Sequence, residues 1–161
     1  MCLSLVGSEM CIRDRMIEVS KAKGSYIYDK HNNRYLDFVA GVSACSVGHC
    51  NKDVISAIKN QSEKYMHVMV YGEFITEPSL DLAKLLSKNL PNSLNCTYFT
   101  NSGTEALEGS MKLARRHTGR TKIIAAKNAY HGSTMGALTL MGLEERKKPF
   151  EPLIPDVELL S

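Results

Sequence analysis

The chain has 161 residues, of which 43% are hydrophobic and 23% charged, and this globular composition excludes a disordered chain. Its net charge of +3 comes from scattered Lys and Arg, so no nucleic-acid-binding tail is expected. No apolar run approaches the roughly 20 residues that cross a bilayer, and the first ten residues lack the pattern of a signal peptide. We therefore expect a cytoplasmic protein with no nucleic-acid and no membrane partner.

The cysteines form an odd, irregular set without a CxxC pair, which argues against a disulfide framework and a zinc knuckle. They are Cys2, Cys11, Cys45, Cys50 and Cys96. Cys45, His49 and Cys50 lie close together, but a fourth ligand at suitable spacing is missing. We expect ordinary packing residues and no metal site.

The two ends of the chain look unlike the middle. Residues 5–14, LVGSEMCIRD, resemble the translation of a transposase adapter used in sequencing libraries, so residues 1–15 are expected to be a non-native scar. A short native helix is the alternative. Residues 150–161, FEPLIPDVELLS, stop at the approach to a new strand, which predicts that the chain is a truncated piece.

Residues 16–75 are predicted to form an amino-terminal segment with a hairpin and a helix. Two aromatic-rich alternating runs within residues 24–41 flank the polar turn from Asp29 to Asn33, a pattern typical of a hairpin. A helix is predicted within residues 48–67, with Asn51 as its cap. Its apolar residues at helical spacing are Val54, Ile55, Ile58 and Tyr65.

Residues 76–161 are predicted to begin a larger α/β domain. A helix over 76–90 has Thr76 as cap, Pro78 in its first turn and Pro91 after its end. Its leucines predict a buried stripe at positions Leu82, Leu85, Leu86 and Leu90. A strand over 96–100, a helix after Gly103, a strand over 121–126 and a helical run after 130–133 follow. This order predicts a mainly parallel sheet.

The junction after the first of these strands has the features of an anion site. Ser102 and Glu105 have the spacing of a capping box, so a helix with free N–H groups is predicted to start here. Gly103 allows a ligand to approach the backbone, and the hydroxyls of Ser102 and Thr104 add donors for a phosphate. Plain helix capping is the alternative.

The next strand is followed by a second turn, NAYHGSTMGA, over residues 128–137. A right-handed crossover brings both turns to the same edge of the sheet. Tyr130 offers a flat ring, His131 a second ring with donor capacity, and Gly132 the space for a planar ligand. The alternative is that Tyr130 packs in the core and His131 caps the helix. Together the two turns predict a planar ring that carries a phosphate.

From Lys21 to Asp156 the chain resembles the class III (fold type I) pyridoxal 5′-phosphate (PLP)-dependent aminotransferases. The matching segments are residues 23–61, the phosphate-loop motif FTNSGTEALEGSMKLAR and the cofactor-stacking motif KIIAAKNAYHGSTMGALTL. The resemblance implies the fold type I α/β architecture and PLP as cofactor. It implies that Ser102, Gly103 and Thr104 hold the phosphate, that Tyr130 stacks on the pyridine ring and that His131 lies beside it.

The same resemblance implies the reaction: transfer of an amino group from an amino acid or ω-amino donor, such as acetylornithine or ornithine, to a 2-oxo acid such as 2-oxoglutarate. It implies a homodimer when the protein is full length. In the family, the Schiff-base lysine and the acidic partner of the ring nitrogen lie after the point where this sequence stops. No catalytic residue is therefore assigned, and the piece is expected to be inactive. Val42 stands where ornithine-type members carry Tyr, which favours an acylated donor.

Two other functions stay open at this stage. A nucleotide-binding Rossmann or P-loop module would use similar strand–helix turns, but the chain has neither G-x-G-x-x-G nor G-x-x-x-x-G-K-[ST]. A non-catalytic α/β module that binds a phosphate ligand is the other alternative.

Overall fold

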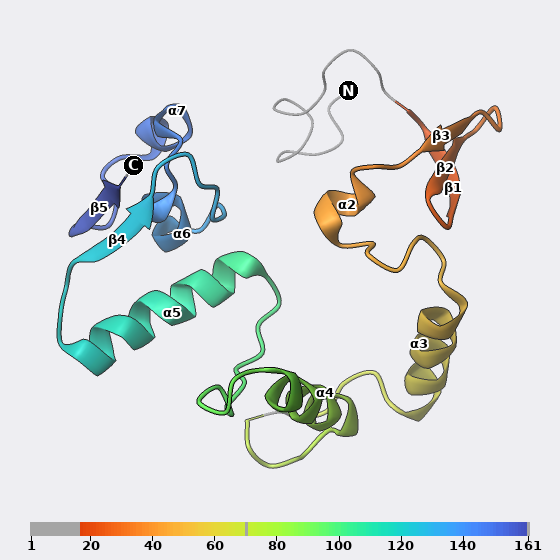
Figure 1. The fold of residues 1–161 in the computed structure, drawn as a ribbon, viewed down its shortest axis with the longest axis horizontal. Helices are drawn as coiled ribbons and strands as arrows, with labels where there is room; N and C mark the ends of the chain where they lie inside the picture. The colour runs from red at the N-terminus through yellow and green to blue at the C-terminus, as the bar shows by residue number, and fades with distance from the viewer. Residues whose placement is uncertain (1–16, 70, 161) are drawn as a thin grey trace. The chain divides into compact units, whose positions relative to one another are not determined.

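A computed structural model describes residues 17–69 and 71–160. The chain forms two compact units that divide between Ile75 and Thr76 (Figure 1). We call them the amino-terminal unit and the carboxy-terminal unit. The expected adapter-derived segment, residues 1–15, lies outside the described residues.

The amino-terminal unit starts with an antiparallel sheet in the order β1 (Val19–Lys23), β2 (Tyr26–Asp29) and β3 (Arg34–Leu36). The predicted hairpin is confirmed by β2 and β3, whereas β1 was not predicted. The carboxylate of Asp29 closes the turn, because it accepts hydrogen bonds from the N–H groups of His31 and Asn33 at 2.8 and 2.9 Å. It also accepts one from the Tyr35 hydroxyl at 3.0 Å.

Helix α3 (Lys52–Lys64) begins at the predicted cap. The side-chain oxygen of Asn51 accepts hydrogen bonds from the N–H groups of Asp53 and Val54 at 2.9 and 3.2 Å. These bonds satisfy two donors that the helix leaves free in its first turn. The apolar face around Ile58, which is 63% exposed, is not buried by any of the described residues.

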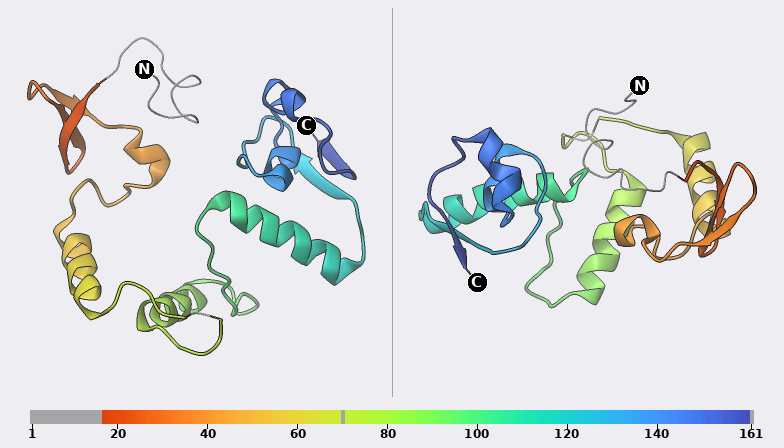
Figure 2. Two further views of the ribbon diagram at one scale, coloured as in Figure 1. Left: turned by 180° about the vertical axis from the view of Figure 1, so that it is seen from behind. Right: turned by 90° about the horizontal axis from the view of Figure 1, so that it is seen from above.

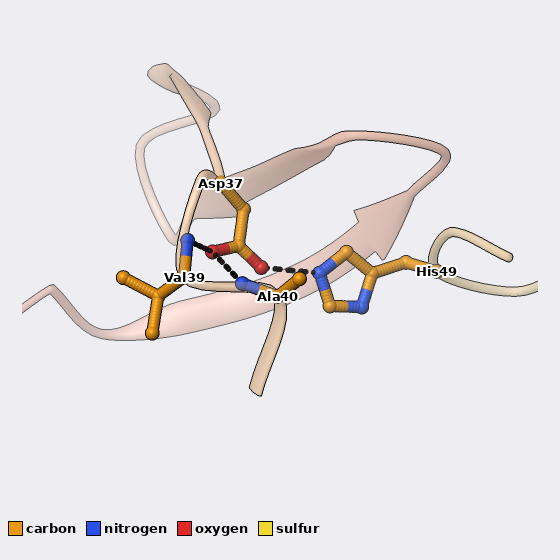
Figure 3. Close-up of polar contacts among 4 residues, drawn as sticks. All are labelled: Asp37, Val39, Ala40 and His49. Carbon is orange, nitrogen blue, oxygen red and sulfur yellow. Dashed lines mark hydrogen bonds and ion pairs between the residues drawn. The ribbon is translucent and has the colours of Figure 1, made fainter. Parts of the chain in front are cut away.

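Asp37 links the sheet to the segment that follows it (Figure 3). One carboxylate oxygen accepts hydrogen bonds from the N–H groups of Val39 and Ala40 at 3.1 and 2.9 Å, and the other lies 2.7 Å from Nε2 of His49. The backbone of His49 pairs in turn with Gly24 through two hydrogen bonds of 2.9 and 2.8 Å. His49 is therefore tied to the sheet and to Asp37 together.

Between Asp37 and His49 lies α2 (Ala40–Ser43), whose residues all adopt positive φ angles from 49° to 68°. Such angles are uncommon for residues other than glycine, so the links on either side hold an unfavourable backbone in place. Val42 lies in this turn and is 86% exposed. Within residues 17–69 and 71–160, no three His, Cys, Asp or Glu side chains are arranged to hold a metal ion.

The Asp37–His49 contact predicts a loss of stability in acid. The hydrogen bond from His49, followed by that from Ala40, lowers the pKa of Asp37 below its ordinary value of 3.8. The unfolded chain therefore takes up this proton at a higher pH than the folded chain. The contribution of Asp37 to stability is complete above roughly pH 4 and is lost as the pH falls through the lowered pKa.

We expect Asp37→Asn to flatten the acid part of the stability–pH curve, measured by urea unfolding between pH 2 and pH 7. Glu63→Gln, an exposed position on α3, is the matched control and should leave the curve unchanged. Parallel curves for wild type and Asp37→Asn would contradict this account.

The carboxy-terminal unit begins with α4 (Glu77–Asn89), which starts after Thr76 and ends before Pro91, as predicted. The Thr76 hydroxyl contacts the Ser79 hydroxyl and makes no cap hydrogen bond to the backbone. The predicted buried leucine stripe is wrong, because Leu82, Leu85 and Leu90 are 46, 58 and 43% exposed. An apolar stripe is buried only where a second element covers it, and no described residue does so here.

The strand predicted over residues 121–126 is formed, and a second strand follows it after a helical connection. Strands β4 (Ile123–Ala126) and β5 (Val157–Leu160) pair in parallel, and they follow the long helix α5 (Gly103–Thr118). The connection between them contains α6 (Met135–Leu140), α7 (Glu144–Lys147) and the short 3₁₀ helix η1 (Lys148–Phe150). This arrangement confirms a mixed α/β fold with parallel strand pairing.

The predicted strand over residues 96–100 is not formed. This segment has no regular secondary structure, and the ring of Tyr98 is 83% exposed. A strand needs a neighbour that pairs with its backbone, and no described strand pairs with this segment.

Helix α6 forms the centre of the carboxy-terminal unit, since it packs on α5 and on both strands (Figure 2). The buried apolar side chains come from α5, from α6 and from the residue after it: Met111, Ala137, Leu138, Leu140 and Met141. This packing fixes the start of α6 against α5. No helix in the described parts of the chain is long and apolar enough to span a membrane.

Candidate functional site

The first part of the candidate site is the start of α5. Ser102 is the N-cap, and its hydroxyl oxygen accepts a hydrogen bond from the N–H of Glu105 at 3.3 Å. The carboxylate of Glu105 accepts one from the N–H of Asn101 at 2.7 Å. The predicted cap is thus confirmed, with the return bond shifted by one residue. Ser102 and Gly103 are exposed, and the first-turn N–H groups have no partner inside the helix.

The second part is the turn before α6, which lies in contact with the first. The hydroxyl oxygens of Thr104 and Thr134 are 2.8 Å apart. Gly132 has a φ of 127°, and a Cβ atom at this position would lie 2.4 Å from the Thr104 hydroxyl oxygen. Only glycine therefore permits this approach. The two turns meet, as predicted, although the strand over residues 96–100 on which that prediction depended is not formed.

Tyr130 and His131 lie on this second turn. The ring of Tyr130 is 58% exposed, its hydroxyl is 3.4 Å from the Ser133 hydroxyl, and the Arg146 guanidinium lies 5.8 Å from its centroid. Tyr130 is thus not buried by any of the described residues. His131 is half-buried, and the N-cap of α6 is Thr134, so the helix-capping alternative for His131 is wrong.

Glu108 is a site residue that sequence analysis missed. One oxygen of its carboxylate accepts hydrogen bonds from the Thr134 hydroxyl at 2.6 Å and from the N–H groups of Gly136 and Ala137 at 2.8 and 3.4 Å. The Thr134 bond is the main reason why the pKa of Glu108 lies below its ordinary value. Its place one turn after Thr104, on the same helix face, was the available signal.

This arrangement fits a planar phosphorylated ligand such as PLP. The positive end of a 16-residue helix is open at Ser102 and Gly103, where an anion is stabilised. An aromatic ring stands exposed on the adjoining turn at Tyr130. The lysines nearest to the two turns in the sequence take no part in the contacts between them: Lys112 is exposed on α5, Lys122 pairs with Glu158 at 3.1 Å, and Lys127 follows β4.

Comparison with known proteins gives the same family as the motifs. Residues 11–161 match the family described as aminotransferase class-III. An acetylornithine aminotransferase from Archaeoglobus fulgidus is 41% identical over 142 residues, which cover 88% of this chain and 37% of that protein. The chain therefore spans about a third of the length of this curated relative.

Solved structures share the fold. A thermostable (S)-enantioselective omega-transaminase from Thermomicrobium roseum superposes with a TM-score of 0.84 at 29% identity, over 90% of this chain and 34% of that one. An amine transaminase from an uncultivated Pseudomonas species, solved in its PLP-bound form, superposes with a TM-score of 0.83 at 26% identity, over 98% of this chain and 37% of that one. The family match covers nearly the whole chain, and we conclude that the chain belongs to the class-III aminotransferases.

Proposed function

We propose that the whole protein is a PLP-dependent aminotransferase that moves the amino group of an acetylornithine-like ω-amino donor to a 2-oxo acid such as 2-oxoglutarate. The family match and the acetylornithine aminotransferase among its relatives support this activity. We further propose a cytoplasmic homodimer, with residues 16–75 and 76–161 as its amino-terminal segment and the start of its PLP-binding domain.

The observation that carries the proposal is the contact between the start of α5 and the Tyr130–Thr134 turn. Ser102, Gly103 and Thr104 would bind the phosphate of PLP at the helix end, where backbone N–H groups and the helix dipole both favour an anion. Tyr130 would stack on the pyridine ring, and His131 would lie beside it. PLP when bound supplies the electron sink for amino-group transfer.

Ser102 has the geometry of a phosphate donor. Its hydroxyl oxygen already accepts the bond from the Glu105 N–H, so the hydroxyl proton remains available for a ligand oxygen. The same contact fixes the side chain at the open helix end. The chain's part in the reaction is therefore to bind the cofactor phosphate and to hold the ring in place.

Val42 would influence the choice of donor. It lies 86% exposed in a turn held by Asp37 and His49, and it replaces the larger Tyr of ornithine-type members. A smaller side chain leaves room for the acyl group of acetylornithine. The expected preference is roughly tenfold, since discrimination in an apolar pocket is worth about 1 to 3 kcal/mol.

Steady-state kinetics of the whole protein tests this proposal through kcat/KM for acetylornithine, ornithine and 4-aminobutyrate with 2-oxoglutarate. We expect acetylornithine to be preferred and Val42→Tyr to reduce its advantage over ornithine. Val47→Tyr, also at an exposed position, is the control and should leave the ratio unchanged. Use of aspartate with none of the three donors would contradict the proposed substrate class.

A further inference from the structure

Glu108 joins both parts of the candidate site through a single carboxylate oxygen. Its Oε1 accepts from the Thr134 hydroxyl and from two N–H groups at the start of α6, at 2.6, 2.8 and 3.4 Å. Gly136 is packed closely against it, because a Cβ atom there would lie 2.4 Å from Oε2 of Glu108. One side chain of α5 thus holds the turn that carries Tyr130.

The hydrogen bonds also fix the direction of the hydroxyl protons. The lowered pKa of Glu108 keeps it ionised at neutral pH, and an ionised carboxylate only accepts. Thr134 therefore donates its single hydroxyl proton to Glu108, at 2.6 Å. In the 2.8 Å contact between the two threonines, the donor must be Thr104.

This direction changes the role expected for Thr104 from the sequence. Its only hydroxyl proton is already donated to Thr134, so its oxygen has acceptor capacity alone. A phosphate is itself an acceptor and gains nothing from that oxygen. The backbone N–H of Thr104 remains available at the helix end, and Ser102 keeps a free hydroxyl proton.

We propose that Glu108 is a positioning residue of the cofactor site: through Thr134 it turns the Thr104 hydroxyl away from the phosphate and holds the Tyr130–Thr134 turn against α5. The inference rests on the proposed function, because it concerns the same PLP site. It assigns the hydroxyl contact with phosphate to Ser102 and leaves Thr104 its backbone N–H. Glu108, Thr134 and the Thr104 hydroxyl act on the cofactor through the position of the turn.

The test compares PLP with pyridoxal, which lacks the phosphate, by titrating each into the whole protein and following the absorbance of the bound ring. A group that contacts the phosphate affects PLP alone, whereas a group that positions the turn affects both. We expect Ser102→Ala to lower the affinity for PLP roughly tenfold and the affinity for pyridoxal only slightly. Thr104→Val and Thr134→Val should each lower the affinity for PLP and for pyridoxal by the same factor, roughly threefold to tenfold.

Two further comparisons separate this role from general damage to the fold. Thr104→Ser and Thr134→Ser keep a hydroxyl and should restore affinity, and the double valine variant should bind no worse than either single variant. Glu108→Gln keeps an oxygen for all three donors and should bind both ligands better than Glu108→Ala does. Glu145→Ala, exposed on α7, is the control.

The outcomes distinguish the two proposals. If wild type binds PLP and Thr104→Val weakens PLP without weakening pyridoxal, Thr104 is a direct donor and the inference is wrong. If wild type binds neither ligand, both the inference and the proposed function are wrong. Should Glu108→Ala fail to fold, as judged by circular dichroism, the threonine variants decide the outcome.

Discussion

Replacement of Met141 by alanine is expected to lower the free energy of unfolding by about 2 to 5 kcal/mol. Met141 is only 1% exposed and follows α6, the helix that packs on α5 and on both strands. Truncation removes apolar surface from the interior and leaves a cavity that close-packed neighbours fill only in part. Urea unfolding of the whole protein, followed by circular dichroism, measures the loss.

Met135→Ala is the matched control, since Met135 is the first residue of α6 and is 49% exposed. Its cost should be below 1 kcal/mol, roughly the range of exposed substitutions. Equal losses for the two variants would show that α6 does not form the core of the carboxy-terminal unit.

The parts of the fold that the sequence predicts are those whose signals are local. The cap at Asn51, the cap at Ser102 and the turn from Asp29 to Asn33 each bring their partners within five residues along the chain. Parallel pairing of β4 and β5 follows from the strand–helix–strand order. In such places one short segment contains both the donor and the acceptor, so spacing is sufficient for prediction.

The parts that sequence analysis missed or got wrong depend on distant partners. The stripe around Leu85 and the strand over 96–100 were predicted from their own patterns, but burial and strand pairing require a second element. The bond between Asp37 and His49 spans 12 residues, and that between Glu108 and Thr134 spans 26. No pattern in a single segment identifies these pairs.

In the candidate site, too, the local features could be predicted from the sequence and the long-range contacts could not. The residue types at Ser102–Thr104 and Tyr130–His131 predict a phosphate and a ring, and the order of predicted strands and helices led us to expect that the two turns meet. The contacts that join the two turns could not be predicted from the sequence. They are the hydrogen bond from Thr134 to the Glu108 carboxylate and the close approach of Gly132 to Thr104. These two contacts are where the largest effects on cofactor binding are expected.

Gly132→Ala is expected to weaken PLP binding by roughly tenfold or more, which corresponds to about 1.4 kcal/mol per factor of ten. The new Cβ would lie 2.4 Å from the hydroxyl oxygen and 2.5 Å from the Cβ of Thr104, a branched side chain that cannot easily move away. The φ of 127° adds strain for any residue with a side chain. The turn must therefore shift away from α5, and Tyr130 shifts with it.

Gly119→Ala separates the steric effect from backbone strain. Gly119 also has a positive φ, 68°, but a Cβ atom there has no neighbour within 4 Å. It should cost about 1 kcal/mol of stability and leave PLP affinity unchanged, since αL strain at the end of α5 does not reach the cofactor turns. The measurements are the thermal unfolding midpoint and PLP titration of the whole protein. If Gly132→Ala binds PLP as tightly as wild type, the contact between the two turns does not hold the cofactor, and the proposed site must lie elsewhere.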